Sequence, residues 1–253
     1  MRRLARNADY VLISGLVWRA LVSFGKGTYV ILNNKSVKRF DKLFTSFIAY
    51  ANDWLQLGDN LCDRSGRTNY GELFNVTMEA FYDEELPSVV SDYVRDNPDR
   101  LSRTDLREIS QWEHGIAGSF FVTRDGRDTV FVVPGFAIAV RGFMKEIDTL
   151  FQYGTLALCE TVLLPFENVV VYAHVINETS TDVLRDIGID LDSFKTHGRT
   201  VRSARDLMRY ADDIRAACDQ IDHMFYGSED DDAMDEEVGG LDNRHAPHDE
   251  VEG

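Results

Sequence analysis

The residues best suited to proton transfer are one adjacent Glu–His pair and one isolated histidine. Glu113 and His114 follow Trp112, and His174 follows the β-prone run Val169–Tyr172. Such groups can act as general acid and base, or supply part of a metal site. Adjacent helical residues point in different directions, however, and no acidic partner for His174 is apparent. Glu113, His114 and His174 are therefore catalytic candidates beside a simpler interpretation, in which they are ordinary solvated or hydrogen-bonded side chains.

Motifs of established chemistry are absent from the sequence. It contains no HExxH, GxSxG, Walker or GxGxxG pattern. The three cysteines, Cys62, Cys159 and Cys218, lie far apart and form no CxxC pair, which argues against a zinc knuckle or a redox dithiol. We therefore predict no cofactor and no metal.

One group of residues could bind an anion. Lys35, Lys38, Arg39 and Lys42 share one face of a predicted amphipathic helix, and we call them the basic face. Four bases can neutralise about four phosphates, which gives weak and salt-sensitive binding to nucleic acid. Base-reading polar side chains and interleaved aromatics do not accompany them, so a solvated helix face is the simpler interpretation. The basic face could also bind the acidic C-terminal segment of the same chain.

The first half of the chain has the apolar periodicity of helices. Ser36 is the expected N-cap of the helix that carries the basic face, and Ser102 with Asp105 forms a capping box. The apolar N-terminal run resembles a signal peptide, but Asp9 precedes it and Arg19 interrupts it. Helices are predicted at 10–24, 37–55, 71–82, 88–95 and 103–116.

From Gly118 the pattern changes from helix to strand. Asp125–Gly126 between apolar runs predicts one hairpin, and Pro165–Asn168 predicts another. We expect an antiparallel sheet of about four or five strands, with a helix covering its apolar face. Strands are predicted at 120–122, 129–133, 136–140, 161–164 and 169–172.

The last predicted helix, 201–225, carries apolar residues in alternating steps of three and four. We call this row the seam. Two interpretations are open: the helix docks on this chain's own sheet or helices, or it pairs with a second copy in a coiled coil. The residues of the seam are Ala204, Leu207, Ala211, Ile214, Cys218, Ile221 and Phe225.

The formal net charge of −16 is concentrated at the C-terminus. After Tyr226 the acids are many and the apolar residues few, so we expect 227–253 to be a disordered acidic tail. The fold class is α+β, with a folded body at 1–226 that is mainly helical over 1–116 and α+β over 117–226. The acidic charge disfavours nucleic acid, no segment is apolar enough to span a membrane, and a cytoplasmic location is expected.

The stretch from Leu86–Pro87 to Tyr172 resembles a pattern found in a group of uncharacterised bacterial proteins. Its other elements are Asn97–Pro98, Trp112, Gly118–Phe120, Val140–Gly142 and Leu163–Phe166. Where similar proteins continue Tyr-Asp-Gly, this chain has Tyr172–Ala173–His174. The shared residues are core and turn types, so the resemblance implies a fold grouping and no activity.

The sequence does not establish the function, and three hypotheses follow from it. The first is a non-enzymatic interaction or regulatory protein, which binds another protein or associates with itself through the final helix. The second is a hydrolase-like enzyme whose site assembles only in three dimensions. The third is weak nucleic-acid association through the basic face.

Overall fold

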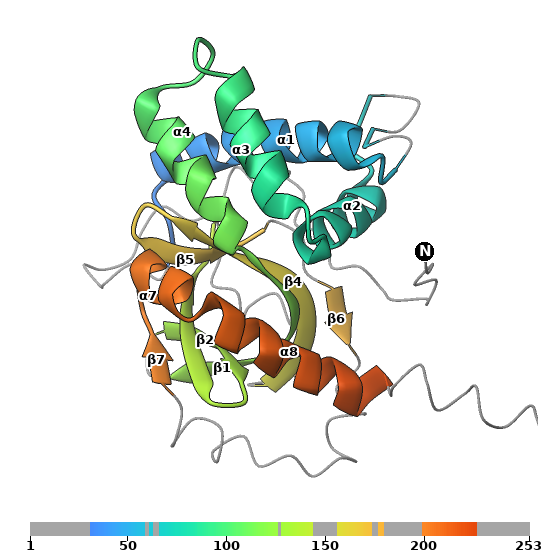
Figure 1. Cartoon of the computed structure of the whole chain (residues 1–253). Coiled ribbons are helices and arrows are strands. Elements are labelled where there is room, and N and C mark those ends of the chain that lie inside the picture. Colours follow the sequence, from blue (N-terminus) through green and yellow to red (C-terminus); the bar gives the residue numbers. More distant parts are fainter. Residues whose placement is uncertain are drawn as a thin grey trace, which may run out of the picture.

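The structure is a computed structural model that describes residues 31–58, 61–62, 66–125, 128–143, 156–173, 177–179 and 199–226. The predicted N-terminal helix 10–24, His174 and the acidic tail lie outside the described residues. Of the described α-helices, four stand at one end of a strongly curved sheet and two lie along its side (Figure 1). The combination of helices and sheet agrees with the predicted mixture.

The helical group comes first in the chain. None of the helices in the described residues is long and apolar enough to cross a membrane. The helices are α1 (Asn34–Leu55), α2 (Tyr70–Tyr82), α3 (Leu86–Asp96), α4 (Arg103–Ser110) and the 3-10 helix η1 (Gln111–His114).

Helix α1 begins earlier than predicted, because its N-cap is Asn33 and not Ser36. The Asn33 Oδ1 atom accepts hydrogen bonds from the backbone N–H groups of Lys35 and Ser36, each at 3.0 Å. Asn is as good an N-cap as Ser, and the Ser36 hydroxyl is thereby released for a tertiary contact. The Ser102 cap of α4 is confirmed, since its Oγ accepts from the N–H of Asp105 at 3.1 Å.

Within the described residues the sheet is mixed and has seven strands, so the prediction of an antiparallel sheet of about four or five strands is wrong. β3 runs parallel to β5 and to β7, whereas the other pairs are antiparallel. The strands are β1 (Ile116–Asp125), β2 (Asp128–Val133), β3 (Phe136–Arg141), β4 (Leu156–Phe166), β5 (Val169–Tyr172), β6 (Asn177–Thr179) and β7 (Arg199–Val201).

Five of the strands close into a ring in the order β1-β2-β3-β5-β4 and back to β1. The closure depends on β1, which pairs with β4 along 116–123 and with β2 along 121–125. A two-residue turn joins β4 to β5, and both of its residues, Glu167 and Asn168, have positive φ angles of 46° and 65°. Two residues of positive φ are the turn that suits the twist of a hairpin, so the second predicted hairpin forms here.

The predicted final helix is two helices, α7 (Ala204–Arg209) and α8 (Ala211–Tyr226). Tyr210 separates them with φ −114° and ψ 15°, and its ring packs on Phe136 and under the guanidinium of Arg199. Helix α8 lies against β1 and β2 of the same chain. Six seam residues are at most 3% exposed, and Phe225 packs on Phe121. Among the described residues the seam is therefore packed on this chain's own sheet, which is the first of the two interpretations.

One hydrophobic core connects the helical group to the ring of strands. Trp112 is fully buried at the junction, where its ring contacts Phe40, Phe44 and Phe47 of α1. Its Nε1–H donates to the backbone oxygen of Pro165 in β4 at 3.2 Å. A buried indole needs such an acceptor, and the bond fixes the β4–β5 hairpin beneath α1.

The docking of α8 on β1 requires glycine at 118. A Cβ atom at this position would lie 2.6 Å from Cβ and 2.9 Å from Sγ of Cys218. We expect Gly118→Ala to lower the free energy of unfolding by about 1–3 kcal/mol through overpacking. Gly71→Ala is the matched control, because its new Cβ meets only Asn69 Oδ1 at 3.8 Å. Denaturant unfolding that ranks the two variants equally would contradict this account of the interface.

Candidate functional site

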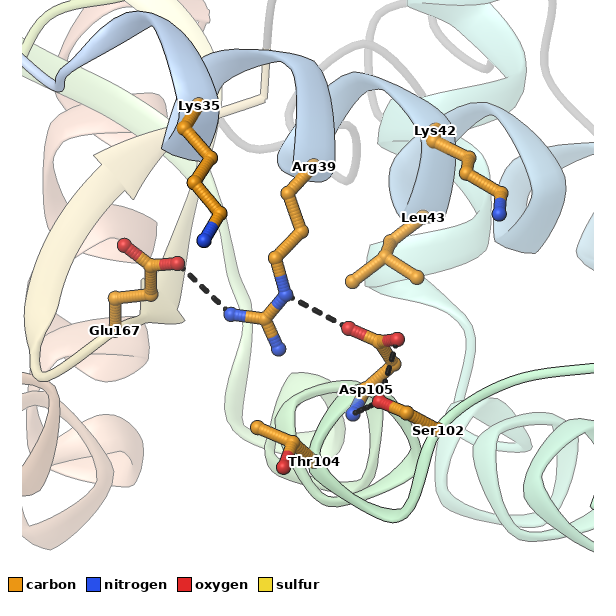
Figure 2. A pocket seen from close by; sticks show the side chains of 8 residues that line it. All are labelled: Lys35, Arg39, Lys42, Leu43, Ser102, Thr104, Asp105 and Glu167. Atoms are coloured by element: carbon orange, nitrogen blue, oxygen red, sulfur yellow. Dashed lines mark hydrogen bonds and ion pairs between the residues drawn. The ribbon is translucent and has the colours of Figure 1, made fainter.

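A pocket of about 500 Å³ lies between α1, the start of α4 and the β4–β5 turn. Three members of the basic face, Lys35, Arg39 and Lys42, line its α1 side. Figure 2 shows Arg39 extending from α1 toward α4, with Lys35 on one side of it and Lys42 on the other. The opposite walls are formed by Ser102, Thr104 and Asp105 of the α4 start and by Glu167 of the turn.

Arg39 is already engaged by two carboxylates. Its Nε donates to Asp105 Oδ1 at 2.7 Å, and its Nη1 donates to Glu167 Oε1 at 2.8 Å. The guanidinium also lies over the ring of Phe166, 5.4 Å from the ring centre. A planar guanidinium holds its N–H donors in a fixed fork and stacks on aromatic faces, which suits these three contacts better than an ammonium does. Arg39 therefore acts as a tie between α1, α4 and the hairpin.

Both carboxylates that face Arg39 are themselves oriented by neighbours. The Ser36 hydroxyl donates to Oε2 of the Glu167 carboxylate. The backbone N–H of Glu167 donates to Glu108 Oε2 at 3.1 Å, which fixes the turn that carries this side chain. Asp105 accepts from the Ser102 hydroxyl at 2.7 Å. Because each carboxylate is fixed by a second contact, Arg39 is held in one position.

The electrostatics keep these groups charged. Burial raises the pKa of Asp105, but hydrogen bonds from Ser102 and Arg39 outweigh it, so its pKa is lowered. Burial lowers the pKa of Arg39, but hydrogen bonds to Asp105 and Glu167 outweigh it, so its pKa is raised. Neither group changes its charge near neutral pH.

Lys35 and Lys42 differ from Arg39, since both are exposed and neither forms an ion pair with a carboxylate of the described chain. Lys38 is exposed on the same helix but does not line the pocket. The basic face therefore divides into one structural base, Arg39, two bases that border an open pocket, Lys35 and Lys42, and one base outside the pocket, Lys38.

The catalytic candidates from the sequence do not meet at this pocket. Glu113 and His114 lie on η1, about 40% exposed, with Nε2 and Oε1 3.5 Å apart. His174 lies outside the described residues. Among the described residues, no three His, Cys, Asp or Glu side chains gather in a way that could hold a metal ion. The exposure of Glu113 and His114 fits the simpler interpretation, in which both are solvated side chains.

A second polar cluster lies where α8 meets α2 and the sheet. Tyr82 of α2 donates to Asp222 Oδ2 of α8 at 3.5 Å. Burial raises the pKa of Asp222, and the nearby charges of Glu160 and Asp219 raise it further, while the hydroxyls of Ser119 and Tyr82 act in the opposite sense. This cluster gathers negative charge, in contrast to the pocket.

The sequence indicated the three bases of the pocket, but it did not indicate that residues of α4 and of the β4–β5 turn form the opposite walls. Asp105 and Glu167 were interpreted only as a capping residue and a turn residue, and they lie 66 and 128 residues from Arg39. The sequence contains a signal for each local element, but it contains none for the pairing between them.

Comparisons with protein-family models, with curated proteins and with solved structures find no match to this chain. The resemblance of the stretch 86–172 to a group of bacterial proteins therefore stays a prediction.

The role of Arg39 can be tested by a change that preserves its charge. We expect Arg39→Lys to lower the free energy of unfolding by about 1–2 kcal/mol, because one hydrogen bond to a charged partner is lost. Arg95→Lys is the control, since Arg95 pairs with Asp92 and Asp96 at an exposed position and should change stability little. Equal unfolding midpoints for the two variants would argue against the tie.

The raised pKa of Asp222 predicts a pH-dependent effect. A carboxyl group whose pKa is higher in the folded than in the unfolded state destabilises the fold once it ionises, and costs nothing when protonated. Asp222→Asn should therefore raise the melting temperature at pH 7, and the gain should shrink as the pH falls toward 4. Asp212→Asn, on the first turn of the same helix and exposed, is the control. A gain that is independent of pH would contradict the assignment.

Proposed function

We propose that this chain is a non-enzymatic interaction protein whose pocket binds an acidic segment of a partner protein. The observation that carries the proposal is the pair Lys35 and Lys42, which border an open pocket on either side of a base that is already neutralised. The partner would supply the carboxylates that these two lysines lack.

The charges of the pocket favour binding over catalysis. General acid–base catalysis needs a group whose pKa lies near the working pH. The pKa of Asp105 is lowered and the pKa of Arg39 is raised, so both pKa values move away from neutral pH and both groups stay charged. Groups that stay charged can attract and orient a partner, but they cannot shuttle protons.

The spacing of the lysines favours an extended acidic peptide. Lys35 and Lys42 are seven residues apart on α1, which corresponds to a rise of about 10 Å. Residues at alternate positions of an extended chain face the same side and lie about 7 Å apart. Two carboxylates at such positions can therefore meet both ammonium groups, because lysine side chains are long and flexible, while the hydroxyl of Thr104 is available at the opposite wall.

Nucleic acid is the competing ligand, because the bases of the basic face could also contact phosphates. In this chain the turn between β4 and β5 places an acid, Glu167, against Arg39. An acid at this turn and an engaged Arg39 both favour a protein partner over a phosphate backbone.

The test is fluorescence anisotropy of the full chain with a labelled peptide that has glutamate at every second position, at low salt. Exposed ion pairs contribute roughly 0.2–1 kcal/mol each, so we expect Lys35→Gln with Lys42→Gln to weaken binding about three- to tenfold. Lys38→Gln is the matched control, because it removes the same charge from the same helix outside the pocket.

Three results would count against the proposal. The first is a peptide affinity that all three lysine changes reduce equally, which would indicate a diffuse field. The second is equal binding of a peptide with glutamine in place of glutamate. The third is tighter binding of a single-stranded oligonucleotide of the same charge, which would favour the nucleic-acid hypothesis.

A further inference from the structure

We propose that the polar cluster where α8 meets the sheet is a binding site for a hard divalent cation, of which calcium fits best. The oxygen atoms of the site belong to Ser119 of β1, Glu160 of β4 and Asp222 of α8. This site is separate from the pocket on α1, and the inference does not depend on the proposed function. Its residues come from three distant parts of the sequence, so they form no calcium-loop motif.

The register of the sheet places the polar side chains in one row. Ser119 pairs with Glu160 between β1 and β4, and Glu160 pairs with Asn177 between β4 and β6. Residues directly opposite each other on antiparallel strands point to the same face, with Cβ atoms about 4.5–5.5 Å apart. The side chain of Glu160 is therefore flanked by Ser119 on one side and by Asn177 on the other.

Helix α8 brings a second carboxylate to the same face. The hydroxyl of Ser119 lies close enough to Asp222 to lower the pKa of that carboxyl group, and the charge of Glu160 raises it. No base of the described residues forms an ion pair with Glu160 or Asp222. Two carboxylates thus share one site without a compensating positive charge from the described part of the chain.

Two buried oxygen atoms of the row have no hydrogen-bond partner. They are Oγ of Ser119, a residue that is 0% exposed, and Oδ1 of Asn177, a residue that is 9% exposed. Nδ2 of Asn177 donates to Glu160 Oε2 at 3.0 Å, so this amide orients the carboxylate. A buried oxygen without a partner costs free energy. A cation bound between Ser119, Glu160 and Asp222 would pair the Ser119 oxygen and neutralise both carboxylates.

The donor atoms determine the class of ion. Carboxylate and hydroxyl oxygens suit hard cations. The thiol of Cys218 is one turn away from Asp222 on α8, but burial raises its pKa, so it stays protonated and offers no thiolate to a soft metal. Only two carboxylates take part, and the remaining ligands are neutral oxygens and water. Calcium tolerates such an irregular shell, whereas magnesium needs a nearly ideal octahedron.

The site is accessible from solvent on the side of α2. Tyr82 of α2 donates to Asp222 Oδ2 at 3.5 Å, and this tyrosine is 53% exposed. Glu160 and Asp222 are themselves only partly buried. An ion can therefore reach the two carboxylates and keep part of its water shell.

The experiment measures the melting temperature of the full chain in chelator, in about 5 mM calcium and in about 5 mM magnesium. A site with few protein ligands binds calcium with a dissociation constant of about 0.1–1 mM. We therefore expect calcium to raise the melting temperature by about 2–8 °C and magnesium to raise it by less than about half as much. The eleven acids after Tyr226 can also attract calcium, so variants must locate the effect.

Three variants each remove one proposed ligand: Glu160→Gln, Asp222→Asn and Ser119→Ala. We expect each to reduce the calcium-induced rise by at least about half. Asp212→Asn is the matched control, because it removes the same charge from an exposed position of the same helix, and it should keep the full rise. Ser119→Ala removes an oxygen but no charge, so its effect distinguishes a bound ion from a diffuse negative field.

Asp222→Asn should melt above the unaltered chain in chelator at pH 7, which separates a lost response to calcium from a failure to fold. An equal rise in the control and in all three variants would overturn the inference. An equal rise with magnesium, or no rise in the unaltered chain, would overturn it as well.

A second readout is terbium luminescence, because a tyrosine ring close to a bound terbium ion transfers excitation energy to it. Tyr82 is placed to do so through its contact with Asp222. We expect sensitised emission that calcium displaces and that Tyr82→Phe strongly reduces, while this variant keeps the calcium-induced rise in melting temperature. Emission that Tyr82→Phe leaves unchanged would place the ion elsewhere and contradict the proposed site.

Discussion

The position of Trp112 determines how the helical group meets the sheet. Its ring fills the space beneath α1, and its N–H bonds to the Pro165 backbone oxygen just before the β4–β5 turn. Aromatic rings of this size contribute much of the apolar surface buried in a core, and the single indole hydrogen bond fixes the orientation of the ring. Because the bond fixes the hairpin under α1, Glu167 arrives opposite Arg39.

The polar contacts at the rim of this interface depend on that arrangement. Arg39 meets Asp105 from α4 and Glu167 from the turn, so one guanidinium connects three elements. Partly exposed ion pairs add little to stability by themselves, but three groups with fixed partners specify one geometry. The pocket is the space left beside this tie, and its remaining charge comes from Lys35 and Lys42.

The sequence predicted what is local in the fold and missed what is distant. The Ser102 cap, the Glu167–Asn168 turn and the apolar face of α1 were recognisable, because each is encoded within a few residues. The parallel contacts of β3 and the three-residue strands β6 and β7 were not, because periodicity needs longer runs and does not specify pairing. For the same reason the bases of the pocket were visible in the sequence while their carboxylate partners were not.

The distribution of charge separates the two ends of the body. Asp219 and Asp222 lie toward the end of α8, near Glu160, whereas the two lysines that border the pocket form no ion pair with a carboxylate of the described residues. Screening at physiological salt limits the effect of such charges to about 8 Å, so each region acts on a ligand only at close range. An acidic ligand is therefore repelled near the end of α8 and attracted at the pocket.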